Sequence, residues 1–132
     1  MLKSKLAKEA IVRMKNRVGV LAQVTKLIAD QSINVDAVIA TVEGDDAVIR
    51  LMTSDHQRTI DTLCGQRLEV QEARVVRVEA AHRPGLLRYI SEKLARENID
   101  LLYLYATAVD ADNCLIVLSS TNNDWAVMVL NC

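Results

Sequence analysis

Two short segments of this 132-residue sequence contain residue types that could hold the charged head group of a small molecule. Residues 16–21 read NRVGVL and residues 82–87 read HRPGLL. In both segments a glycine stands directly before a run whose apolar spacing predicts a helix. A helix N-terminus presents backbone N–H groups and a partial positive charge, which suit a carboxylate. Glycine at this place would let such a ligand approach the backbone closely.

The first segment supplies six candidate ligand-binding residues. Asn16 carries both a donor and an acceptor, so it could contact the carboxylate and the ammonium of an amino acid. The alternatives are structural: Asn16 caps the helix, and Gly19 only permits a tight turn. The candidates are Asn16, Arg17, Val18, Gly19, Val20 and Leu21.

The two segments belong to an internal repeat with an offset of 66 residues, the separation of Asn16 and His82. We expect this offset to hold without a gap from residue 16 to about residue 56, where Ser54 would correspond to Ser120. Apolar residues recur at matching places in the runs that follow each glycine. A repeat of this length indicates that one supersecondary plan is used twice.

The first copy can be divided into elements from its patterns. Apolar and polar residues alternate over 9–15, which predicts a strand ahead of the glycine. Two extended runs, 33–42 and 47–53, are separated by a polar turn and predict a hairpin. A short helix from about residue 54 to 66 and a strand at 68–73 complete the copy. The order β-α-β-β-α-β is that of ferredoxin-like domains.

We therefore expect an α+β fold with two ferredoxin-like βαββαβ modules in tandem, at residues 8–73 and 74–132. The sequence of the second copy ends where its last strand would begin. Either its sheet has three strands or another segment fills the vacant edge. An exposed sheet edge favours pairing with another chain, so we also expect a homodimer.

The segment NRVGVLAQVTKLIADQSINVDAV resembles the first strand-to-helix turn, helix and second strand of ACT domains, which are regulatory modules of amino-acid metabolism. The family motif is often written N-x-P-G-x-L, with a second asparagine on the following strand. The resemblance covers nearly the whole chain. It implies allosteric binding of a free amino acid between two such modules. It also adds Asn34 to the candidates, as the asparagine that faces the neighbouring module.

The second copy has the proline of the motif but lacks both of its asparagines. His82 stands at the place of Asn16, and Asp100 stands at the place of Asn34. His82 could still form hydrogen bonds, whereas Asp100 would favour an ammonium over a carboxylate. We expect one competent type of site, centred on Gly19, and either a variant site or a structural relic in the second copy. The candidates of that copy are His82, Gly85, Leu86 and Asp100.

Composition argues against several other classes of protein. A formal net charge of −1 and an aromatic content of 3% give no reason to expect nucleic-acid binding. No apolar run is long enough to span a membrane. The three cysteines lack the spacing of a zinc site or a disulfide framework, so we expect no metal, no cofactor and a cytoplasmic location. No catalytic arrangement of side chains is recognisable, so we expect no enzymatic activity.

Two functional hypotheses follow. The first is a non-catalytic regulatory protein that binds a free amino acid at interfaces between ACT modules and transmits this binding to a metabolic enzyme partner. The alternative is a ligand-free module for protein–protein interaction or dimerisation in amino-acid metabolism. Titration with the standard amino acids separates them, because only the first hypothesis predicts binding.

Overall fold

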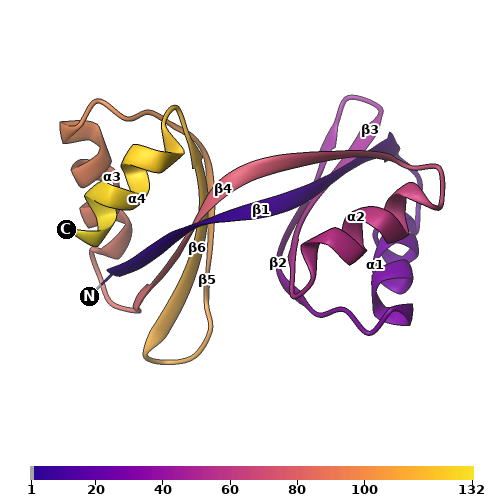
Figure 1. Cartoon of the computed structure of the whole chain (residues 1–132), viewed down its shortest axis with the longest axis horizontal. Helices are drawn as coiled ribbons and strands as arrows, with labels where there is room; N and C mark the ends of the chain where they lie inside the picture. The colour runs from indigo at the N-terminus through magenta and orange to yellow at the C-terminus, as the bar shows by residue number, and fades with distance from the viewer. Residues whose placement is uncertain (1) are drawn as a thin grey trace. The chain divides into compact units, whose positions relative to one another are not determined.

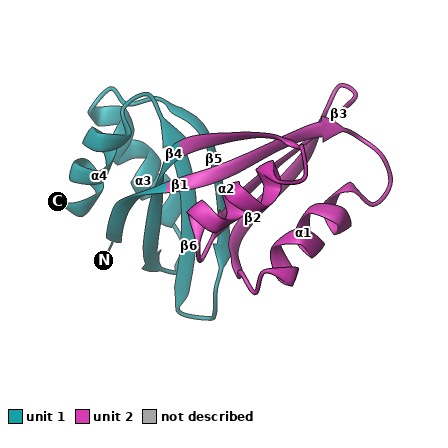
Figure 2. Ribbon diagram, turned by 45° about the vertical axis from the view of Figure 1, so that its right-hand side comes forward, with its two compact units in different colours: residues 1–7, 74–132 teal, residues 8–73 magenta. Residues whose placement is uncertain are grey.

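The computed structural model describes residues 2–132, and these residues form two compact units. Unit 2 is Lys8–Ala73, and unit 1 combines residues 2–7 with residues 74–132 (Figure 2). The elements, in chain order (Figure 1), are β1 (Leu2–Lys15), α1 (Val20–Asp30), β2 (Val35–Glu43), β3 (Asp46–Thr53), α2 (His56–Cys64), β4 (Glu69–Ala81), α3 (Leu86–Arg96), β5 (Leu101–Ala108), β6 (Asn113–Ser120) and α4 (Asn123–Asn131).

Unit 2 is a four-stranded sheet with two helices. Its strands have the order β2-β3-β1-β4, to which β1 and β4 each contribute the part that lies within this unit. Strand β3 is antiparallel to both neighbours, and Ile49 lies opposite Val12 of β1 and Ala40 of β2. The helices bury Val24 and Leu63 in a core that includes Val12 and Ile49. This order of elements confirms the α+β class and the ferredoxin-like plan for this part of the chain.

Unit 1 uses the same plan with a different source for one strand. Its strands have the order β1-β4-β6-β5. Ile116 of β6 lies opposite Val78 of β4 and Ala106 of β5, and both pairs of strands are antiparallel. Helices α3 and α4 bury Ile90 and Leu130 against the sheet. Strand β4 is continuous from Glu69 to Ala81, so the two strands expected there are one.

Of the two alternatives for the last strand of the second copy, the one in which another segment fills the vacant edge is correct. Residues 2–7 of β1 take the fourth place in the sheet of unit 1, beside β4. Leu2 packs on the core of this unit. Ser4 is buried, and its Oγ donates a hydrogen bond to the carbonyl oxygen of Val127 at 3.0 Å. The strand therefore comes from the opposite end of the sequence, and the unit is larger than residues 74–132.

The uniform offset of 66 residues is also wrong beyond the hairpin. In unit 2 the N–H of Ser54 donates to the carbonyl oxygen of Asn34 at 2.9 Å. In unit 1 the matching bond runs from Thr121 to Asp100 at 3.0 Å. Asn34 and Asp100 keep the offset of 66, whereas Ser54 and Thr121 differ by 67. The hairpin between β5 and β6 is thus one residue longer than its counterpart.

Candidate functional site

Gly19 and Gly85 are the N-cap residues of α1 and α3, and we call the two turns the glycine corners. Their φ angles of +92° and +87° lie in the left-handed region, which glycine adopts without steric cost. A Cβ added at either glycine would meet no atom within 4 Å. No side chain caps either helix. The corners are open, and no side-chain oxygen occupies the N–H groups of the first turn.

The two corners are held by matching backbone hydrogen bonds. The N–H of Asn16 donates to the carbonyl oxygen of Asp45 at 2.8 Å, and the N–H of His82 donates to that of Asp112 at 2.9 Å. Each bond ties the end of a strand to the neighbouring hairpin. The side chain of Asn16 does not cap α1, so that structural alternative is wrong. Asn16 is instead exposed beside the open corner.

A pocket lies beside each glycine corner. The first corner pocket, in unit 2, has a volume of about 240 Å³ and is bounded by the start of α1 and by strands β2 and β3. Its lining residues are Asn16, Arg17, Gly19, Val20, Leu21, Ala40, Thr41, Val42, Ala47 and Ile49. Five of the six candidates from the first segment are therefore brought together.

The second corner pocket, in unit 1, has a volume of about 450 Å³ and lies at the start of α3 and the end of β5. Three of the four second-copy candidates line it, namely His82, Gly85 and Leu86. The residues that sequence reasoning missed include those of β2 and β5, where Ala40-Thr41 and Ala106-Thr107 occupy matching places. The identity of these two pairs across the repeat was the available signal.

Asn34 and Asp100 lie away from the pockets. Each precedes the first residue of its strand, whereas the pockets contact the far ends of β2 and β5. The backbone N–H of Asn34 donates to Ser54 Oγ at 3.1 Å, and the backbone N–H of Asp100 makes the equivalent bond to Thr121 Oγ1 at 3.1 Å. Asn34 therefore does not line the first corner pocket, and Asp100 does not line the second.

Val18 and Arg17 differ from the other candidates of the first segment. Val18 lies at the tip of the turn with its side chain fully exposed, and it does not line the first corner pocket. Arg17 lines the pocket, and its Nη2 donates a hydrogen bond to Oε1 of Gln23 on α1. The guanidinium of Arg17 therefore already has an acceptor within the protein.

One carboxyl group close to the second corner has a shifted pKa. Asp110 lies in the hairpin between β5 and β6, where its oxygens accept hydrogen bonds from the Asn113 side chain at 3.0 and 3.1 Å. It also accepts from the backbone N–H groups of Asp112 and Asn113. These bonds favour the charged carboxylate and lower the pKa of Asp110 below its ordinary value of 3.8. Within residues 2–132, no three His, Cys, Asp or Glu side chains gather as a metal site requires.

Comparison with protein families identifies one domain in the chain. The ACT domain pattern matches residues 9–62, so this stretch, which holds the first glycine corner, is an ACT domain. No curated protein matches the sequence. Across the part of the chain that the structure describes, no helix combines the length and the apolar character needed to cross a membrane.

Several solved structures share the fold. A protein from Bacteroides thetaiotaomicron has a TM-score of 0.90 at 25% identity, over 97% of this chain and 88% of that chain. The aspartokinase alpha and beta subunits give 0.69 at 18% identity, over 98% and 95%. The ligand-free regulatory subunit of aspartate kinase from Thermus thermophilus gives 0.69 at 12% identity, over 96% and 91%. At these last two identities the likeness is one of fold.

Proposed function

We propose that the chain is a non-catalytic regulatory protein that binds a free amino acid at the Gly19 corner. The observation that carries this proposal is the open, uncapped start of α1 inside an ACT domain. The N–H groups of the first helical turn would bind the α-carboxylate, where the helix dipole is favourable. The side-chain amide of Asn16 would accept from the α-ammonium, because it lines the same pocket.

The rest of the first corner pocket suits an uncharged side chain. Val20, Val42 and Ile49 line it, and Arg17 is bonded to Gln23. No aspartate or glutamate lines this pocket, so a basic ligand side chain would find no carboxylate there and its desolvation would be uncompensated. We infer that small aliphatic amino acids bind better than basic ones.

We further propose that residues 74–132, together with residues 2–7, form a second ACT-type module, so that the chain is a tandem of two. Its corner has a similar φ, +87° against +92°, and the added Cβ would likewise meet no atom within 4 Å. His82 and Asp100 replace the asparagines, so this corner would be a variant site that binds the same ligand more weakly or not at all.

A second copy of the chain would complete the site. Strand β2 is the outer strand of unit 2, and it exposes Val38 and Val42. Exposed apolar side chains on an edge strand favour association with another chain. Asn34 does not line the corner pocket of its own unit. In a homodimer built on this edge, Asn34 of the other copy would contact the ligand instead. Binding would then stabilise one dimer arrangement, and an enzyme of amino-acid metabolism would recognise that arrangement.

A melting-temperature screen against the 20 amino acids tests this proposal. A ligand at a hundred times its Kd adds about 2.7 kcal/mol to the free energy of unfolding. Ala40→Asp places a carboxylate in the first corner pocket and should abolish the shift by repelling the ligand. Ala106→Asp makes the same change at the matching place of β5 and is the control. Both alanines are exposed, so both variants should fold.

The screen also separates the two functional hypotheses. A shift that Ala40→Asp removes and Ala106→Asp keeps supports the Gly19 site. A melting-temperature shift that is lost only in Ala106→Asp would indicate that the ligand binds at the second corner. No shift with any amino acid, in a protein that dimerises, favours the ligand-free interaction module.

A further inference from the structure

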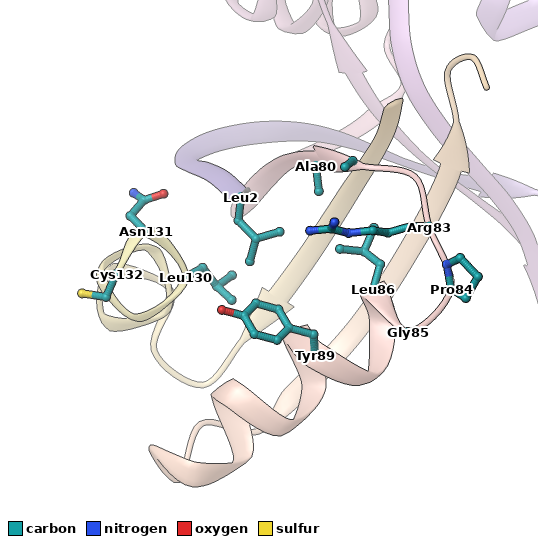
Figure 3. Close-up of a pocket in the computed structure, with 11 residues that line it drawn as sticks. Leu2, Ala80, Arg83, Pro84, Gly85, Leu86, Tyr89, Leu130, Asn131 and Cys132 are labelled. Atoms are coloured by element: carbon teal, nitrogen blue, oxygen red, sulfur yellow. The ribbon is translucent and has the colours of Figure 1, made fainter. Parts of the chain in front are cut away.

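A third and larger pocket lies in unit 1, and it shares Arg83, Gly85 and Leu86 with the second corner pocket. It has a volume of about 670 Å³, and we call it the helix-end pocket because it lies between the start of α3 and the end of α4. Figure 3 shows the side chains of Leu2, Arg83 and Tyr89 pointing toward a common space, with Leu130 beside them. Most of its lining is apolar, and Arg83 is its cationic side chain.

Arg83 differs from its counterpart in the other half of the repeat. Arg17 donates to Gln23 on the next helix. The residue at the place of Gln23 is Tyr89, whose hydroxyl oxygen accepts a hydrogen bond from Lys93 at 3.2 Å. No hydrogen bond or ion pair engages the Arg83 side chain within residues 2–132. The second copy has thus lost the acceptor that holds this arginine in the first copy.

The pocket exists because unit 1 obtains its fourth strand from residues 2–7. In unit 2 the chain passes directly from α2 into β4, and Leu68 of that connection packs on the core. In unit 1 the strand in this place arrives from the other end of the sequence. Leu2 of this strand and Leu130 of α4 both line the pocket.

We propose that the helix-end pocket binds a small monocarboxylate with an apolar body and no amino group. The Arg83 guanidinium would pair with the carboxylate in a bidentate hydrogen-bonded ion pair. Leu2, Leu130 and the ring of Tyr89 would contact the apolar body, and the volume exceeds that of a medium-length acyl chain. This site is separate from the proposed amino-acid site at Gly19 and lies in the other unit.

The lining discriminates against amino acids. None of its lining residues is an aspartate or a glutamate, so an α-ammonium would have no side-chain carboxylate to pair with. The Arg83 cation would also repel it. A 2-oxo acid or a fatty acid avoids both costs, which separates this ligand class from that of the glycine corner.

Amide chemical shifts recorded with octanoate test the proposal on the full chain. We expect saturable shifts at Leu2, Tyr89 and Leu130, which line no corner pocket, and no shift at Gly19. The pair 4-methyl-2-oxopentanoate and leucine has one carbon skeleton with and without the ammonium, and only the oxo acid should shift these three amides. Arg83→Gln should weaken octanoate binding at least about tenfold, since a hydrogen-bonded ion pair is lost.

Two further variants make the result specific. Arg96→Gln removes the same charge from the far end of α3, outside the pocket, and should leave octanoate binding unchanged. Tyr89→Gln restores the acceptor that holds Arg17 in the other copy and should weaken octanoate binding. Absence of saturable shifts at millimolar octanoate would overturn the proposal. So would equal binding by Arg83→Gln, or shifts confined to the corner pockets.

Discussion

The side chain of Asn131 pairs with the backbone of Ser4 across 127 residues of sequence. Its Nδ2 donates to the Ser4 carbonyl oxygen at 2.9 Å, and its Oδ1 accepts from the Ser4 N–H at 2.7 Å and from Oγ at 2.9 Å. The side-chain amide of Asn131 thus offers the Ser4 backbone one donor and one acceptor, as the backbone of a neighbouring strand would. This relationship fixes the N-terminal strand to α4 and completes unit 1.

Replacing Asn131 by alanine should destabilise the protein. Asn131→Ala leaves the N–H and C=O of the buried Ser4 without partners, and we expect the free energy of unfolding to fall by about 1–3 kcal/mol. Urea denaturation measures this. Asn131→Asp sets a carboxylate oxygen against the Ser4 carbonyl oxygen, so it should destabilise the protein as well. Equal stability of all three proteins would show that residues 2–7 are not held as described.

Substitution of the corner glycines should destabilise the protein because their φ angles are positive. Gly19→Ala forces an L-residue to φ +92° and should cost about 1 kcal/mol or more, although the space beside it is open. Gly65→Ala is the control, because Gly65 has a φ of −62°. Its new Cβ would lie 3.3 Å from the Asp61 carbonyl oxygen, a small adjustment. Thermal unfolding of both variants should rank Gly19→Ala as the less stable.

Helices α2 and α4 should each depend on one capping side chain. Asp55 accepts from the N–H of Arg58, and Asn122 accepts from the N–H of Trp125, both at 3.1 Å. Asp55→Ala and Asn122→Ala should each lower the free energy of unfolding by about 1 kcal/mol. Replacement of either cap by serine should recover most of the loss. A cap variant as stable as the wild type would contradict the assigned helix start.

The hairpin between β5 and β6 should lose stability in acid. The pKa of Asp110 is lowered in the folded protein, so its contribution is present at pH above about 3.8 and is lost as the pH falls through the folded-state pKa. Carbonyl ¹³C titration gives that pKa directly. Asn113→Ala removes the largest cause of the shift and should raise the pKa of Asp110 toward 3.8. An unchanged pKa would contradict the role of the Asn113 side chain.

The elements of each copy could be predicted because the repeat preserves periodicity in register. Val24 and Ile90 are buried at matching helical positions, and each glycine precedes its helix as expected. The offset failed at the second hairpin because a polar turn of either length satisfies the same pattern. The extra residue is visible in the backbone pairing of Asp100 with Thr121 and of His82 with Asp112.

The source of the fourth strand of unit 1 could not be predicted. Residues 2–8 carry lysines at 3, 5 and 8, and Leu6 remains exposed, so hydropathy gives no sign of a strand that completes a sheet. Its recognition depends on Ser4 and Asn131, two polar residues at opposite ends of the sequence. The helix-end pocket, which depends on this exchange, was equally invisible to sequence analysis.

The most direct test of the amino-acid site is an amide chemical-shift titration with the amino acid that raises the melting temperature most. Binding at the Gly19 corner predicts saturable shifts at Gly19, Val20 and Leu21 and at the side-chain amide of Asn16, all absent in Ala40→Asp. Saturation that leaves these four groups unmoved, or no saturable shift with any of the 20 amino acids, would contradict it.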